Sequence, residues 1–463
     1  MKGWREASLP GLIRPSVLQA IAIGDSVLGL GVGVASNRRL SGVPLAESLQ
    51  AFARWMIWAA VLLTMTTPRV AVGTVHVTAG DLLGVAAGIC WLVSWVVSPS
   101  KPMDLRAAIW PSLILAIGAA SAASSQEPRA AIVGLAELAI LWVLPAMAVP
   151  NLLSTQVRVA WFLICVSVGS LIAGSANIIQ ALGTGTLNGG LPQVWGPVQY
   201  FQGYFQAVGL VIAASHFLGA ITARRAAASL MWCLACLVNA GALLLTQTRG
   251  AWLAAIAAVI VLGILWRPGV LVGAIGVVSA AALAFWSADW ASIVRERVQS
   301  IFSLEAGLSG FESSLGRLGL MVTAWRMFIA HPLLGIGLKN FPIAMPQYAP
   351  PGMPLAYEMG PDRILTAVEG PHSTYLALLS EVGVFGLVGL VCWEAGAMWR
   401  LFREGRGDPS LEGGSRRNAA VLLAAATVVV VYNFFFEMTQ TGMLVFVSVL
   451  ALGYRARQQQ HPT

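Results

Sequence analysis

His372 stands in the run GPHSTYLALLSEVGVFGLVGL, where a long polar loop meets an apolar segment. An imidazole titrates near pH ~6.5, so at neutral pH it can take a proton from a hydroxyl group as a general base. A histidine at the start of a helix also often serves as a structural hydrogen bonder, and the residues alone leave both interpretations open. The other histidines of the chain are scattered and suggest no shared site.

Two arginines could act with this histidine. Arg249 lies in LLLTQTRGAWLAA, between two apolar runs, and Arg317 lies in SSLGRLG. A guanidinium keeps its charge and binds phosphate through two parallel hydrogen bonds, so this pair could hold a diphosphate. The same side chains could instead reach lipid headgroups or solvent. If both lie near His372, their charge favours the neutral imidazole that a base requires.

A second set of polar residues is expected to contact substrate: Gln199, Tyr200, Gln202, Tyr375 and Glu381. The first three come from the loop 182–202, whose amides and aromatic rings could hydrogen-bond to sugars and stack on them. Aromatic residues also gather at membrane interfaces as anchors, which is the alternative interpretation. Glu381 lies in an apolar segment, where a carboxylate needs a partner: it could pair with an arginine, orient another residue, or form a purely structural pairing.

No metal or cofactor is predicted. The acidic residues of the predicted external loops show no DxD spacing. Cys233 and Cys236 form a CxxC inside an apolar run without further metal ligands, and buried cysteines usually behave as small hydrophobic side chains. The sequence therefore predicts metal-independent chemistry.

The elements that must position these residues are membrane helices. The chain is 57% hydrophobic and only 10% charged, whereas a soluble domain carries about 25% charged residues. About 20 apolar residues span the hydrocarbon core. We predict an all-α integral membrane protein with about twelve transmembrane helices, in the apolar runs 45–66, 80–98, 106–123, 130–149, 157–181, 203–222, 229–247, 250–267, 269–287, 373–399, 419–436 and 441–454. The glycine-rich run 16–35, interrupted by Asp25, is expected to be interfacial or re-entrant, and a thirteenth span is the alternative.

Positive charge predicts the orientation. The link after 399 carries Arg400, Arg403, Arg406, Arg416 and Arg417, and arginine-rich links face the cytoplasm. This rule accounts for the net charge of +8 and makes nucleic acid an unlikely partner. Residues 1–463 are expected to form one membrane domain, with 288–371 as an external insertion.

The insertion itself contains a helical signal. Within SSLGRLGLMVTAWRMFIAHP, apolar residues recur at helical spacing and Pro332 marks the stop. We expect this amphipathic helix to lie on the membrane surface, with its polar face toward a cavity.

Three segments together resemble the superfamily of O-antigen ligases and polymerases, which are GT-C-type membrane glycosyltransferases. The segments are TQTRGAW, then SSLGRLGLMVTAWRMFIAHPLLGIGLKNF, then PHSTYLALLSEVGVFGLVGL. The resemblance covers about 249–400, and it implies that Arg249, Arg317 and His372 are the key residues of the site. Family members often have Asn after the histidine, where this chain has Ser373.

The resemblance implies an enzyme of the inner membrane of Gram-negative bacteria, with both termini in the cytoplasm and the active site facing the periplasm. A ligase would transfer O-antigen polysaccharide from undecaprenyl pyrophosphate to a sugar of the lipid A core, in lipopolysaccharide biosynthesis. A polymerase would use the same donor and a lipid-linked repeat as acceptor. A protein O-oligosaccharyltransferase is a third relative. A lipid-linked sugar transporter or flippase is the alternative from another class, although charges gathered at one outer mouth favour surface chemistry over transport.

Overall fold

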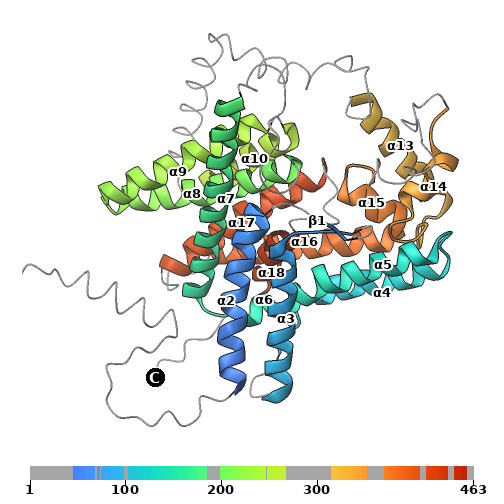
Figure 1. Ribbon diagram of the computed structural model, residues 1–463, viewed down its shortest axis with the longest axis horizontal. Coiled ribbons are helices and arrows are strands. Elements are labelled where there is room, and N and C mark those ends of the chain that lie inside the picture. Colours follow the sequence, from blue (N-terminus) through green and yellow to red (C-terminus); the bar gives the residue numbers. More distant parts are fainter. Residues whose placement is uncertain are drawn as a thin grey trace, which may run out of the picture.

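We analysed a computed structural model, which describes residues 45–67, 70–72, 75–98, 103–184, 199–246, 248–266, 314–351, 370–406, 413–435 and 443–455 (Figure 1). The described part is a bundle of helices. They are α2 (Leu45–Thr66), α3 (Ala79–Val97), α4 (Ile109–Ala123), α5 (Pro128–Leu138), the π-helical turn η1 (Ala139–Val143), α6 (Leu144–Leu152), α7 (Gln156–Thr184), α8 (Gln199–Thr222), α9 (Ala226–Leu245), α10 (Arg249–Trp266), α13 (Ser314–Ala330), α14 (Phe341–Tyr348), α15 (Thr374–Glu381), α16 (Gly383–Arg406), α17 (Gly413–Asn433) and α18 (Met443–Leu452).

Eight segments of the described part are long and apolar enough to cross a membrane, and three shorter apolar helices accompany them. The chain is therefore a multi-pass membrane protein. The predicted run at 45–66 coincides with α2, and most other runs lie within a few residues of a helix. The runs 16–35 and 269–287 lie outside the described residues.

Three local features differ from the predicted helices. The run 373–399 forms two helices, α15 and α16, that meet at Val382 and Gly383, and Gly383 has a φ of +81°. In a chain predicted to be all-α, the link between α2 and α3 contains a short antiparallel hairpin, in which β1 (Val70–Val72) pairs with β2 (Val75–Val77). Valine-rich sequence favours strands, which explains this small exception to the all-α prediction.

The third difference is η1, which joins α5 to α6 within one continuous span. Pro145 has no N–H to donate to the carbonyl four residues earlier, so the helix must adjust just before it. Here the N–H of Leu144 donates to the oxygen of Ala139, five residues back. The helical span Pro128–Leu152 is therefore continuous through Pro145.

The core of the bundle is formed around α18, whose side chains are all buried, and α17, most of whose described side chains are buried. α17 packs against α7, α8, α10 and α16. Aromatic rings join the neighbouring helices: Tyr204 of α8 lies 5.6 Å from Tyr432 of α17, measured between ring centroids. Because α17 contacts helices from both halves of the chain, its ends fix the positions of elements that are distant in sequence.

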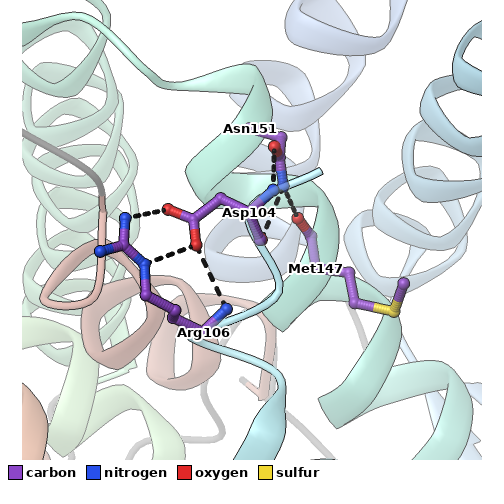
Figure 2. Close-up of polar contacts among 4 residues, drawn as sticks. All are labelled: Asp104, Arg106, Met147 and Asn151. Carbon is purple, nitrogen blue, oxygen red and sulfur yellow. Dashed lines mark hydrogen bonds and ion pairs between the residues drawn. The ribbon is translucent and has the colours of Figure 1, made fainter. Parts of the chain in front are cut away.

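The link between α3 and α4 is pinned to α6 (Figure 2). The carboxylate of Asp104 accepts hydrogen bonds from Nε and Nη2 of Arg106, both at 2.9 Å. The side-chain amide of Asn151 donates to the backbone oxygens of Asp104, at 3.0 Å, and Met147, at 2.7 Å. In return, the N–H of Asp104 donates to Oδ1 of Asn151 at 3.1 Å. This short link is held by hydrogen bonds at both its backbone groups and its charged side chains.

The insertion contributes α13 and α14 to the described part. α13 ends at Ala330, two residues before Pro332, as predicted. Leu318, Trp325 and Ile329 are exposed, in agreement with a face turned toward lipid. Leu320 and its neighbours on the opposite side are buried and pack against α14 and α15, and the expected polar face toward a cavity stays a prediction.

Close helix packing in this bundle rests on glycines, as is common in membranes. A Cβ on Gly80 of α3 would lie 2.1 Å from Oγ1 of Thr64 and 2.3 Å from the oxygen of Ala60. We therefore predict that Gly80→Ala separates α3 from α2 and lowers the thermal unfolding midpoint in detergent by about 5 °C or more. Gly183 of α7 is the matched control, because its Cβ would meet no atom within 4 Å. An unchanged midpoint in Gly80→Ala would contradict the described α2–α3 contact.

Candidate functional site

The elements that carry Arg249 and His372 meet at the C-terminal end of α17. A Cβ on Gly250 would lie 2.6 Å from Cβ of Phe435, so the first turn of α10 rests on the residues that follow α17. Oγ of Ser373 donates to the backbone oxygen of Asn433 at 3.3 Å. The residue after Arg249 and the residue after His372 thus both contact the segment 433–435, although the sequence separates them by more than 120 residues.

His372 has an unusual backbone. Its φ is +53°, in the left-handed region that non-glycine residues rarely adopt. The next residue, Ser373, caps α15, and its hydroxyl accepts a hydrogen bond from the N–H of Leu376 at 3.5 Å. A disfavoured conformation of this kind persists only where the surrounding contacts enforce it, and such residues cluster at functional sites.

Arg317 lies in the first turns of α13 and is partly buried. A small apolar core, which includes Leu320 and Phe341, joins α13 to α14, and Leu376 of α15 packs against it. Leu320 follows Arg317 by one helical turn, and Leu376 follows His372 by four residues. The structure therefore brings the helix of Arg317 against the helix that begins after His372.

The segment HPLLGIGLKN, between α13 and α14, forms backbone hydrogen bonds to the junction of α15 and α16, and we call this arrangement the clamp. The N–H of Ile336 donates to the oxygen of Ser380 at 3.0 Å, and the N–H of Val384 donates to the oxygen of Pro332 at 2.9 Å. Gly335 and Gly383, both with positive φ, approach the partner backbone so closely that a Cβ would lie within 2.3 Å of it. These glycines are needed because two backbones touch there.

Glu381 belongs to this clamp. Its Oε1 accepts from the N–H of Phe341 at 3.0 Å, and its backbone oxygen accepts from Oγ of Ser121 at 2.8 Å. The sequence left open an arginine partner, an orienting role or a structural pairing, and the described carboxylate holds the start of α14. Its predicted contact with substrate stays a prediction.

An ion pair fastens the clamp to the membrane helices. Nζ of Lys339 donates to Oε1 of Glu137 on α5, and both side chains are largely buried. Beside it, Oδ1 of Asn340 accepts from the N–H of Glu127 at 2.9 Å. The insertion is thus tied to α5 as well as to α15.

The other predicted substrate contacts lie in different surroundings. The hydroxyl of Tyr375 donates to Oε2 of the buried Glu394 at 2.8 Å, so it points into the bundle. Gln202 is fully buried, and its Oε1 accepts from Nδ2 of Asn177 at 3.4 Å. Gln199 and Tyr200 begin α8, but their side chains lie outside the described residues. All four therefore stay predictions as substrate contacts.

Sequence reasoning missed three residues that organise this region: Glu137, Lys339 and Glu394. Glu137 and Glu394 each interrupt a long apolar run. A carboxylate within a span is costly and usually functional or paired, so that signal was available. In the part of the chain that the structure describes, no three His, Cys, Asp or Glu residues lie together in a group that could hold a metal ion.

Comparison with known proteins gives one family match. Residues 233–391 match the model of the family described as O-antigen ligase. The resemblance indicated by the three sequence motifs is confirmed for this stretch, which contains Arg249, Arg317 and His372. The match points to a glycan transferase acting on lipid-linked O-antigen substrates.

A curated relative gives a shorter similarity. The fluoride-specific ion channel FluC 2 of Prochlorococcus marinus (strain MIT 9313) is 37% identical to this chain over 81 residues. The aligned segment covers 17% of this chain and 64% of the channel, so less than two thirds of the channel is represented. This similarity assigns no activity to the chain.

The ion pair between Lys339 and Glu137 yields a prediction about stability. Lys339→Met leaves a largely buried carboxylate without its cation, which costs about 3 kcal/mol in comparable pairs. We expect a lower thermal midpoint in detergent for this variant. The double variant Glu137→Gln, Lys339→Met should recover most of the loss, because it also removes the stranded charge. If the single variant melts like the unaltered protein, the pair does not fasten the insertion.

Proposed function

We propose that this protein transfers O-antigen polysaccharide from undecaprenyl pyrophosphate to a sugar of the lipid A core, on the periplasmic side of the inner membrane of a Gram-negative bacterium. One observation carries this proposal: the start of α10 and the start of α15 both contact the end of α17. The first element carries Arg249 and the second follows His372, and both residues lie within the stretch that matches the O-antigen ligase family.

The proposed reaction is a single displacement. The acceptor hydroxyl oxygen attacks the anomeric carbon of the donor, and the bond from that carbon to the diphosphate oxygen breaks. His372 takes the hydroxyl proton, which typically accelerates a reaction about 10²–10⁴-fold. Arg249 and Arg317 stabilise the negative charge that develops on the leaving undecaprenyl pyrophosphate. One displacement inverts the configuration of the anomeric carbon, and no step requires a metal ion.

The start of α8 is proposed to contact the sugars. A Cβ on Gly203 would lie 3.1 Å from Cβ of Thr248, so α8 begins beside the residue that precedes Arg249. Gln199, Tyr200 and Gln202 belong to this first turn. Tyr375 and Glu381 are proposed as further substrate contacts, next to the hydrogen bonds that they make to Glu394 and to the N–H of Phe341.

We expect His372→Ala to reduce glycan transfer at least about 100-fold, because no base remains to take the hydroxyl proton. Expression, detergent elution and thermal midpoint should be unchanged. His331→Ala is the matched control, since His331 is exposed and its Nε2 lies 3.1 Å from the hydroxyl of Tyr348. Transfer at the original rate in His372→Ala would refute the proposed base.

We expect Arg249→Lys to lose donor affinity, because an ammonium keeps the charge but cannot bind phosphate through a planar pair of hydrogen bonds. The measurement is the KM for a synthetic undecaprenyl pyrophosphate glycan, with Arg326→Lys of α13 as control. An unchanged KM would contradict a phosphate contact at Arg249.

A third test concerns acceptor and stereochemistry. Purified protein in liposomes receives the donor together with lipid A core, with or without chelator. A ligase should modify the core, produce the inverted anomer by NMR, and keep its rate in chelator. Longer lipid-linked donor without core modification would identify a polymerase, and activity restored only by a divalent ion would refute the metal-independent mechanism.

A further inference from the structure

Hydrogen bonds connect a buried carboxylate to the segment that follows His372. Glu394 is only 4% exposed, in the middle of the candidate span α16. Its Oε1 accepts from Nδ2 of Asn433 at 2.8 Å, and its Oε2 accepts from the hydroxyl of Tyr375 at 2.8 Å. A carboxyl group at this position is expensive in a membrane, so its retention calls for a reason.

Asn433 also forms hydrogen bonds to the two residues that follow His372. Its Oδ1 accepts from Oγ1 of Thr374 at 3.1 Å, and its backbone oxygen accepts from Oγ of Ser373 at 3.3 Å. The two residues that follow His372 are therefore both bound to one asparagine, and Glu394 fixes the side chain of that asparagine. Thr374 and Asn433 are buried, so water does not compete for these hydrogen bonds.

The backbone of His372 explains what this network does. Its φ of +53° costs about 1 kcal/mol or more for a non-glycine residue. Anchoring Ser373 and Thr374 keeps the chain from relaxing to a normal conformation, which would turn the imidazole elsewhere. The same end of α17 also supports the start of α10, through the contact of Phe435 with Gly250.

We propose that Glu394 is a positioning residue, which holds His372 in its reactive orientation through Asn433, Ser373 and Thr374. The inference rests on the proposed function and adds residues to it, because Glu394 and Asn433 both lie beyond the matched stretch 233–391. The role of Glu394 is geometric: it supplies two acceptor oxygens at fixed places, and it takes no part in the proton transfer itself.

The hydrogen bonds indicate how glutamine would fit. In Glu394→Gln, the amide oxygen can accept from Asn433. The new NH₂ can donate to the hydroxyl of Tyr375, which then donates to the backbone oxygen of Val430, 3.0 Å away. Every group keeps a partner, whereas Glu394→Ala leaves the amide of Asn433 buried without its acceptor.

The experiment compares these variants in the liposome transfer assay. Glu394→Ala should lower kcat at least about tenfold, with a KM for the donor within about threefold of the original, because the arginines remain in place. Glu394→Gln should restore kcat to within about threefold. Thr427→Val, which removes another buried hydroxyl of α17, is the matched control, since Oγ1 of Thr427 donates to the backbone oxygen of Leu423 in its own helix. Unaltered kcat in Glu394→Ala, or equal losses in Ala and Gln, would overturn the proposal.

A second readout does not depend on the reaction. Diethyl pyrocarbonate modifies accessible imidazoles, and peptide mass spectrometry gives its rate at His372. That rate should change at least about threefold in Glu394→Ala and stay the same in Glu394→Gln. An unchanged rate in the alanine variant would overturn the positioning role, even if the unaltered protein transferred no glycan. If the alanine variant fails to fold, Thr374→Val cuts one link of the chain and should show a smaller shift in both readouts; no shift in either would overturn the proposal.

Discussion

Hydrocarbon supplies no water to buried polar groups, and this constraint organises the whole region around the candidate site. An N–H, carbonyl or carboxylate group that lacks a partner inside the protein is costly there. Glu394 is satisfied by Asn433 and Tyr375, and Glu137 is satisfied by Lys339. Because these partners come from different helices, satisfying the polar groups also decides which helices lie together.

In the insertion, polar groups also find partners within the protein, but mainly through the backbone. Its clamp uses backbone hydrogen bonds, at Ile336 and Val384, and glycines that allow two chains to touch. The carboxylate of Glu381 and the ion pair of Lys339 add side-chain contacts at its edges. A loop held mainly by its backbone can keep its position while the exposed side chains around it change.

Much of the helical framework could be predicted, because a long apolar run is a local property of the sequence. The apolar run at 45–66 is one example, and its bounds coincide with those of α2. The break between α15 and α16 could not be predicted in the same way, since it depends on the close approach of Leu333 to Gly383. The residue types and the family resemblance suggested that Arg249 and His372 act together. Their shared support at Asn433 and Phe435 depends on contacts with α17, which no local pattern encodes.

The parts of the candidate site are attached to the bundle through different contacts that meet at α15. The His372 segment and the start of α10 rest on the end of α17, where Thr374 and Asn433 are buried and no water can replace their hydrogen bond. α13, with Arg317, rests on the clamp and on the small core that it shares with α14 and with Leu376 of α15. Under the proposed function, the base and both arginines need one fixed geometry. Because α15 begins beside His372 and also packs against the core of α13, it is the element that holds Arg317 in a fixed relation to the histidine.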